Sequence, residues 1–132
     1  MKRVLIDTNV ILDAALQRKP FVYAADSLFS KIEKGIIKGF VTALSVSDIF
    51  YILRKNGGRE NAILFIRELV DILDVLDVTK GNIIEALNSD FRDFEDAIQY
   101  SVADTNQIDI IVTRNKADFK LSTIEVCYPD EL

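Results

Sequence analysis

The 132-residue sequence contains no histidine and only one cysteine, and these two shortages exclude several kinds of functional site. Without histidine there can be no zinc site of the Cys/His type, no Ser-His-Asp triad and no acid–base catalysis by imidazole. The one cysteine, Cys127, cannot form a disulfide within the chain, and its apolar, strand-like surroundings predict a buried, unreactive thiol. Any catalysis must therefore depend on carboxylates, hydroxyls, lysines or a bound metal ion.

Long hydrophobic runs and glycine-rich loops are also missing. With no twenty-residue apolar stretch and no signal-peptide pattern, we expect a soluble protein of the cytoplasm with no membrane contact, where a free cysteine stays reduced. The few glycines, among them Gly57 and Gly58, form no phosphate-binding loop, which argues against a nucleotide-binding protein.

The sequence has no excess of positive charge, and its net charge of −5 argues against a nucleic-acid-binding protein. This objection is partial, because net charge does not report how charge is distributed over the surface. A cluster of carboxylates that has bound divalent cations presents positive charge to a phosphate.

Short β-like runs alternate with amphipathic helical stretches along the chain, which predicts a βαβ series in one domain spanning residues 1–132. This alternation predicts an α/β fold with a mostly parallel sheet of four to five strands, covered by helices on both faces. In such sheets the functional cleft lies beyond the carboxyl ends of the strands. The predicted strands are Arg3–Ile6, Phe40–Ala43, Val75–Val78, Ile110–Thr113 and Ile124–Cys127.

Two amphipathic helices are predicted between these strands, over Phe21–Ile37 and Arg59–Leu73. The turn Asn56–Gly58 separates two helices, so the second crossover is expected to contain a helical hairpin. The apolar side of the helix over Phe21–Ile37 is typical of core packing, and a contact with a second copy or with a partner protein is the alternative.

Two acidic residues follow predicted strands. Asp7 ends the first strand, where a carboxylate can accept backbone N–H groups at the start of a helix. Asp48 follows the second strand and stands three residues after Ser45, which is the spacing of a capping box with aspartate in place of the usual glutamate. Each position alone has a purely structural explanation.

Three further acids flank the fourth strand. Asp93 and Asp96 are three residues apart, so a helix would place both on one face and would turn its apolar residues toward the core: Phe94, Ala97 and Ile98. Acids also suit the positive end of a helix, which is a structural explanation for this pair. Asp118 follows the fourth strand in a polar turn, where a solvated aspartate is common.

The combination of these acids is more informative than any one of them. If the first, second and fourth strands are neighbours, the carboxylates converge at one edge of the sheet. Carboxylates held together repel one another, and protonation or a hard divalent cation with oxygen ligands relieves the repulsion. The sequence therefore predicts a Mg²⁺ or Mn²⁺ site, which suits phosphodiester hydrolysis because a bound ion activates water and neutralises charge on the phosphate.

Polar neighbours of these acids could support such a site. Asp93 is an additional acid beside Asp96. Arg114 and Lys116 could hold a phosphate beside the metal, although ordinary solvated charges explain them equally well. Four residues could orient ligands or water molecules: Thr8, Asn9, Thr113 and Asn115.

The runs VLIDTNVILD, DFEDA and IVTRNKADF resemble, in this order, the motifs of the PIN domain family, and the resemblance spans essentially the whole chain. It implies a three-layer, Rossmann-like α/β fold with an acidic metal-binding pocket and metal-dependent endoribonuclease activity. Members of this size include the VapC-type toxins of toxin–antitoxin pairs, which cleave RNA, commonly form dimers and are silenced by a small protein. The resemblance therefore implies an RNA substrate, a small antitoxin partner and a homodimer.

Carried over by position, the resemblance makes Asp7, Asp96 and Asp118 metal-binding catalytic acids. Asp48 stands where the family commonly has glutamate, and its side chain is one methylene shorter, so a water-mediated catalytic role is an alternative to direct metal binding. Many members have aspartate directly after Thr-Arg, whereas this chain has Asn115 there and an acid three positions later.

Other classes of protein fit less well. A haloacid-dehalogenase-type phosphatase needs a second aspartate two residues after the first, and Asn9 occupies that place. A receiver domain of the response-regulator type needs paired acids near the start of the chain, where the first strand supplies only Asp7. The remaining alternative is a PIN-like domain that binds RNA or a protein without cutting.

Overall fold

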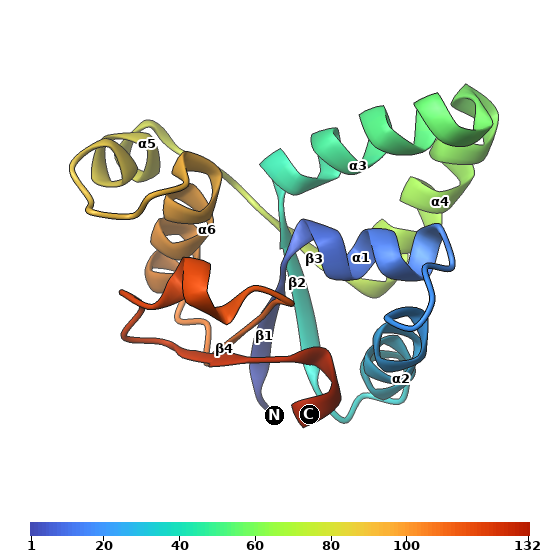
Figure 1. Ribbon diagram of the computed structural model, residues 1–132, viewed down its shortest axis with the longest axis horizontal. Helices are drawn as coiled ribbons and strands as arrows, with labels where there is room; N and C mark the ends of the chain where they lie inside the picture. The colour runs from blue at the N-terminus through green and yellow to red at the C-terminus, as the bar shows by residue number, and fades with distance from the viewer.

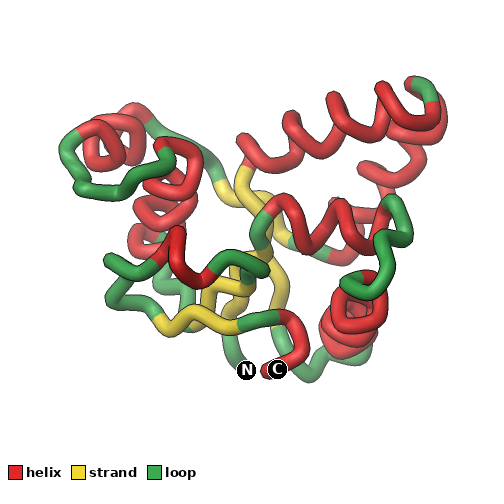
Figure 2. Tube along the Cα trace, viewed as in Figure 1, coloured by secondary structure: helices red, strands yellow, loops and turns green.

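The computed structural model describes residues 1–132, and its centre is a sheet of five parallel strands (Figures 1 and 2). The strand order is β3-β2-β1-β4-β5, so the first, second and fourth strands are neighbours, as the convergence of the acids requires. The α/β prediction is confirmed. The strands are β1 (Arg3–Ile6), β2 (Lys38–Thr42), β3 (Asp74–Leu76), β4 (Ile110–Val112) and β5 (Glu125–Cys127).

Helices cover both faces of the sheet and make three layers. In Figure 1, α5 and α6 lie on one side of the strands, and α1 to α4 lie on the other. None of the helices combines the length and apolar character needed to cross a bilayer. The helices are α1 (Thr8–Ala15), α2 (Val22–Glu33), α3 (Ala43–Gly57), α4 (Arg59–Ile72), α5 (Lys80–Leu87) and α6 (Phe94–Thr105), with short 3₁₀ helices η1 (Lys116–Phe119) and η2 (Pro129–Glu131).

The predicted helical hairpin is present, because α3 and α4 are separated at Gly58, which has φ +86°. The α2 helix ends at Glu33, four residues before the predicted end. Gly35 follows with φ +75°, a conformation that ends a helix at little cost in glycine, and Ile37 then packs into the core outside the helix. β1 has the predicted bounds, the bounds of the other strands differ from the prediction by at most two residues, and Ala43 begins α3 instead of ending β2.

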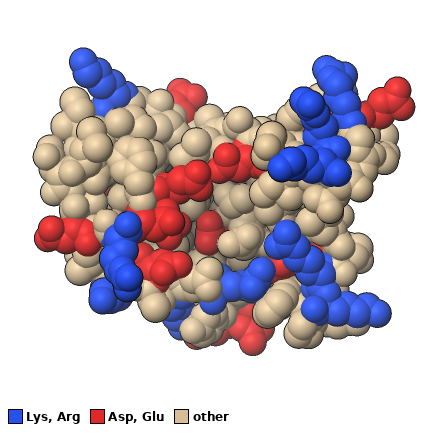
Figure 3. Space-filling view, turned by 45° about the horizontal axis from the view of Figure 1, so that its top comes forward, with Lys and Arg blue, Asp and Glu red and all other residues tan.

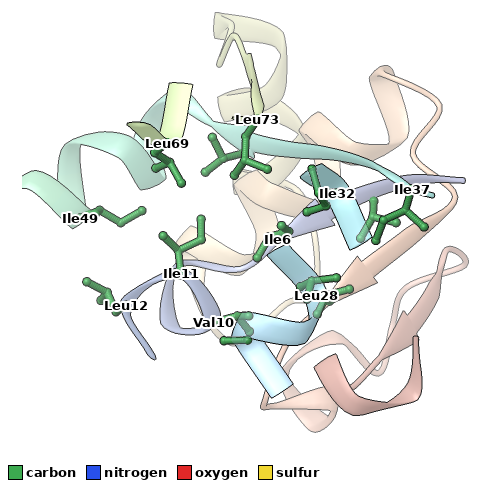
Figure 4. Close-up of a cluster of buried hydrophobic side chains, with 14 of the residues drawn as sticks. Ile6, Val10, Ile11, Leu12, Leu28, Ile32, Ile37, Ile49, Leu69 and Leu73 are labelled. Atoms are coloured by element: carbon green, nitrogen blue, oxygen red, sulfur yellow. The ribbon is translucent and has the colours of Figure 1, made fainter. Parts of the chain in front are cut away.

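The largest core lies between the sheet and α1 to α4 (Figure 4). Ile6 at the end of β1 lies among Val10 and Ile11 of α1, Leu28 of α2 and Leu73 after α4. All are at most 2% exposed, and each such side chain contributes roughly 1.5–3 kcal/mol through burial. The apolar run at β1 is thus explained by burial of a central strand on both faces.

Close packing also accounts for one glycine in β2. A Cβ atom at Gly39 would lie 2.5 Å from Leu73 Cδ2 and 2.7 Å from Ile32 Cδ1, so no larger residue fits without displacing these side chains. The strand therefore lies close against α2 and the end of α4.

Candidate active site

A cleft of about 430 Å³ opens at the carboxyl ends of β1 and β4, between α3 on one side and α6 on the other. We call it the acidic cleft, because its charged lining residues are all carboxylates. Figure 3 shows acidic side chains gathered in a band across this part of the surface. The acids that line it are Asp7, Asp48, Asp93, Glu95, Asp96 and Asp118. Polar lining residues include Thr8, Asn9, Gln99 and Asn115.

The structure thus brings together all four predicted catalytic acids and Asp93, from segments that are distant in sequence. Asp7 is both a helix cap and a lining residue, since its Oδ1 accepts a hydrogen bond from the Thr8 backbone N–H at 2.8 Å. Asp7 can therefore cap the helix and take part in the site at the same time. The carboxylate is only 6% exposed, and its position is set by its partners.

Two side chains on other elements hold this carboxylate in place. Thr113, after β4, donates its hydroxyl to Asp7 Oδ2 at 2.8 Å, and Gln99 of α6 donates Nε2 to Oδ1 at 2.9 Å. Both partners are buried, and the Thr113 Oγ1 also accepts from the Asn115 backbone N–H. These bonds orient Asp7 as supporting groups orient metal ligands. Gln99 was missed, although a polar residue one turn after Asp96 on a buried helix face was a usable signal.

Asp48 reaches the cleft from the second turn of α3. The predicted Ser45–Asp48 capping box is wrong, because α3 begins earlier and Thr42 is its N-cap, with Oγ1 accepting from the Ser45 backbone N–H at 3.1 Å. Ser45 is therefore inside the helix, and its hydroxyl accepts a hydrogen bond from Thr8 Oγ1 at 2.8 Å. This bond ties the start of α1 to the start of α3. Asp48 therefore caps no helix, and its side chain lines the cleft with the other acids.

Asp96 lies in the first turn of α6, and the cleft strongly perturbs it. Burial raises the pKa of Asp96 to about 7, aided by repulsion from Asp7, Asp93, Asp118 and Glu95. With this pKa, the carboxyl group of Asp96 can either keep its proton at neutral pH or lose it and bind a cation.

Asp93 and Glu95 complete the acidic side of α6. Asp93 is the N-cap, so it precedes the helix instead of sharing a helical face with Asp96, and its Oδ1 accepts from the Asp96 backbone N–H at 3.0 Å. Burial raises the pKa of Glu95, as does repulsion from Asp48, and sequence reasoning missed this residue. The prediction that Phe94 faces the core is wrong, because it is 47% exposed, whereas Ala97 and Ile98 are buried.

The loop after β4 closes the cleft. Asn115 lines it at the position directly after Thr-Arg, and the Asp118 backbone N–H donates to the Asn115 carbonyl at 3.0 Å as η1 begins. Asp118 therefore brings a carboxylate to the cleft from one turn further along the chain. Although Asn115 and not an acid follows Thr113 and Arg114, the loop still supplies an acid to the cleft through Asp118.

Arg114 and Lys116 of the same loop, for which a phosphate-binding role and an ordinary role as charged residues were both open, do not line the cleft. The Arg114 guanidinium donates to both carboxylate oxygens of Asp13, at 2.7 and 3.2 Å, and lies 4.0 Å from the Phe21 ring centroid. Lys116 pairs with Glu131 at 2.6 Å. Both cations are engaged by partners elsewhere, and Asp13, 1% exposed, could not be buried without such a pair.

The donor set fits a hard divalent cation. All the charged groups offer oxygen, burial and then their mutual repulsion raise the pKa of Asp96, and Gln99 Oε1 is a buried acceptor with no hydrogen-bond partner. No three carboxylates are arranged to coordinate one ion together. An ion here would therefore complete its shell with water, as Mg²⁺ commonly does.

Comparisons with known proteins agree with this fold. The chain is 26% identical to Ribonuclease VapC1 of Aquifex aeolicus, over 98% of this chain and 92% of the relative. The fold matches DNA-bound VapBC from Salmonella typhimurium with a TM-score of 0.72 at 15% identity, over 98% of this chain and 99% of the other. It also matches VapC20 of Mycobacterium tuberculosis, a sarcin-ricin loop cleaving toxin, with a TM-score of 0.67 at 15% identity, over 82% of this chain and 86% of the other. The family model for the PIN domain matches residues 3–117. The resemblance read from the motifs is thus confirmed, and this chain belongs to the PIN domain family.

Proposed function

We propose that this chain is a divalent-metal-dependent endoribonuclease that hydrolyses RNA phosphodiester bonds. The observation that carries the proposal is the acidic cleft, where Asp7, Asp96 and Asp118 converge from three parts of the chain, and where burial and then repulsion from the other acids raise the pKa of Asp96 to about 7. Divalent-metal dependence is general among ribonucleases of this family, and the relative from Aquifex aeolicus is named a ribonuclease.

In this proposal Asp7, Asp96 and Asp118 hold Mg²⁺ or Mn²⁺, directly or through water. The ion, when bound, would supply a more acidic water and neutralise charge on the scissile phosphate. Thr113 and Gln99 keep the Asp7 carboxylate in a fixed orientation through their hydrogen bonds. Their role is to position a ligand for the ion without touching the substrate.

Asp48 acts from the opposite wall of the cleft. Burial raises the pKa of Glu95, and repulsion from Asp48 raises it further, so the two carboxyl groups lie close to each other in the cleft. Such a pair can accept a proton from an attacking water molecule or orient one by hydrogen bonding.

We also propose that the protein is the toxin of a toxin–antitoxin pair and forms a homodimer. The solved relatives include the toxin–antitoxin complex from Klebsiella pneumoniae, matched at a TM-score of 0.71 and 17% identity. In this chain a groove of about 380 Å³ runs between α2 and α4, with Phe29, Phe65 and Ile72 on its floor and Asp26, Glu33 and Glu68 among its walls. Its apolar floor and acidic walls suit an antitoxin segment with apolar and basic side chains.

The first experiment is cleavage of a mixed RNA substrate with Mg²⁺ or Mn²⁺ and in metal-free buffer. Asp7→Asn and Asp96→Asn should each lose metal-dependent cleavage while remaining folded. Asp104→Asn is a matched control, because Asp104 is an exposed acid on α6 that does not line the cleft. If native protein and both variants behave alike on several RNAs, with no inhibitor co-purified, the alternative of a PIN-like RNA- or protein-binding module replaces the nuclease proposal.

A further inference from the structure

The exposed side of α3 continues the wall of the acidic cleft away from the carboxylates. Tyr51 and Lys55 follow Asp48 by three and seven residues, so the three side chains lie along one face of the helix. Tyr51 lines the cleft beside Asp48, yet its side chain is 58% exposed. A large aromatic ring thus stands at the point where the acidic cleft meets the open surface.

Beyond this ring the charge changes sign. Arg54 and Lys55 occupy the last turn of α3, and Arg59 begins α4, and all three are exposed. None of them pairs with a carboxylate, in contrast to Arg114 and Lys116, and Figure 3 shows basic side chains gathered beside the acidic band. Three unpaired cations at one mouth of an acidic cleft form a site for an anionic chain.

The Tyr51 ring also contacts one of these cations, Lys55. The Lys55 ammonium lies 4.8 Å from the centroid of the Tyr51 ring, which is within the range of a cation–π contact. From Asp48 to Lys55 the helix advances about 10 Å at 1.5 Å per residue. A strand that leaves the cleft along this face meets the ring first and the cations next.

This order matches what single-stranded nucleic acid needs. Sites for unpaired strands combine aromatic side chains, on which bases stack, with positive charge that follows the phosphates. Inside the cleft, carboxylates repel every phosphate that no metal ion neutralises. Binding of the substrate strand must therefore come from outside the carboxylate cluster, and α3 is the wall that offers both components.

We propose that Tyr51 stacks on an unpaired base next to the scissile phosphate, and that Lys55, with Arg54 and Arg59, binds the backbone phosphates that follow. This inference rests on the proposed ribonuclease function, because it takes RNA as the substrate. The proposal also gives the direction of the RNA, which leaves the cleft toward the α3–α4 turn and not toward Arg114, whose guanidinium is paired with Asp13.

The test measures binding separately from cleavage. Fluorescence anisotropy of a labelled oligouridine is recorded in metal-free buffer, where no metal-dependent cleavage occurs, and again at short times with Mg²⁺. Tyr51→Ala should weaken binding by about tenfold or more, while Tyr51→Phe retains most of it, because the ring and not the hydroxyl stacks on the base. Tyr23→Ala is the matched control, since Tyr23 is 63% exposed on α2 and does not line the cleft.

The cations are tested by salt dependence. Each of Lys55→Gln and Arg59→Gln should reduce the slope of log affinity against log salt concentration by roughly one phosphate contact, whereas Lys31→Gln on α2 should leave it unchanged. Kinetics with Mg²⁺ should show the Tyr51→Ala loss mainly in KM, because the ring does not touch the reacting atoms. The substituted side chains are exposed, except that of Lys31, which is partly exposed, and circular dichroism verifies that the variants fold.

Each unfavourable outcome has a separate meaning. If native protein cleaves RNA and Tyr51→Ala binds and cleaves within twofold of native, this inference is overturned and the proposed function stands. If native protein neither binds nor cleaves RNA, both are overturned. If Tyr51→Ala changes the mass measured by light scattering but not the affinity for oligouridine, the α3 face is a protein interface and the RNA assignment is wrong.

Discussion

Replacing Asp96 with asparagine should make the metal-free protein more stable at alkaline pH. Burial and the surrounding acids raise the pKa of Asp96 from 3.8 to about 7, so the folded state holds this proton more tightly than the unfolded state does. A raised carboxyl pKa makes stability fall as pH rises from about 4 to about 7, and the full penalty remains above pH 7. Asparagine has the same shape and carries no charge, so it removes the penalty.

The size of the effect follows from the same pKa. A rise from 3.8 to about 7 corresponds to about 4 kcal/mol, because each pKa unit is about 1.4 kcal/mol. Asp96 is partly exposed to water and solvent screens its repulsion, so we expect about 1–2 kcal/mol. For a chain of this size that is roughly 3–8 °C in the melting temperature at pH 8. Near pH 4 the difference should almost vanish.

Thermal unfolding in a chelating buffer at pH 4 and pH 8 measures this difference. Asp104→Asn serves as control, because it removes an exposed charge from the same helix and should shift the melting temperature little at either pH. Added Mg²⁺ or Mn²⁺ should stabilise the native protein more than Asp96→Asn, since only the native site keeps the central carboxylate. A variant that is less stable than native at pH 8, or equally shifted at both pH values, would refute the reasoning.

Three further predictions concern the stability of the fold, and urea unfolding checks each of them. Arg114→Ala should lower the free energy of unfolding by about 3 kcal/mol, because it leaves the buried Asp13 carboxylate without its bidentate partner; an unchanged midpoint would contradict this. Gly39→Ala should cost about 1–3 kcal/mol, since its Cβ would lie 2.5 Å from Leu73 Cδ2, and a stabilised variant would show that the packing is looser than described. Thr42→Val should cost about 1 kcal/mol by removing the N-cap of α3, while Thr42→Ser should restore most of it; equal stability of the two variants would exclude the cap.

The sequence was sufficient to predict a parallel sheet with acids near the carboxyl ends of its strands, because both depend on patterns that are local to each segment, whereas the convergence of the acids also required a strand order that only the structure supplies. The apolar runs identified the five strands, and the carboxyl ends of parallel strands necessarily meet at one edge. Asp7 and Asp118 could therefore be placed near each other without knowledge of any contact between them.

The partners of individual side chains could not be predicted in the same way. Arg114 follows a strand just as a phosphate-binding residue would, but its orientation is set by Asp13, which lies 101 residues earlier in the chain. Gln99 has a local position consistent with simple burial, and its role depends on Asp7, 92 residues away. Contacts of this kind are determined by how helices pack on the sheet, which the spacing of residues does not encode.

The hydrogen bond between Thr113 and Asp7 joins residues 106 positions apart, and it has a consequence for synthesis of the chain. Because β4 pairs directly with β1, the ribosome must release the chain through β4 before the central pair of strands can form. A nascent or truncated chain that ends before β4 lacks both this strand and Asp118. Nuclease competence is thus expected to arise only after β4 and the loop that carries Asp118 have been synthesised, because folding depends on this long-range pairing.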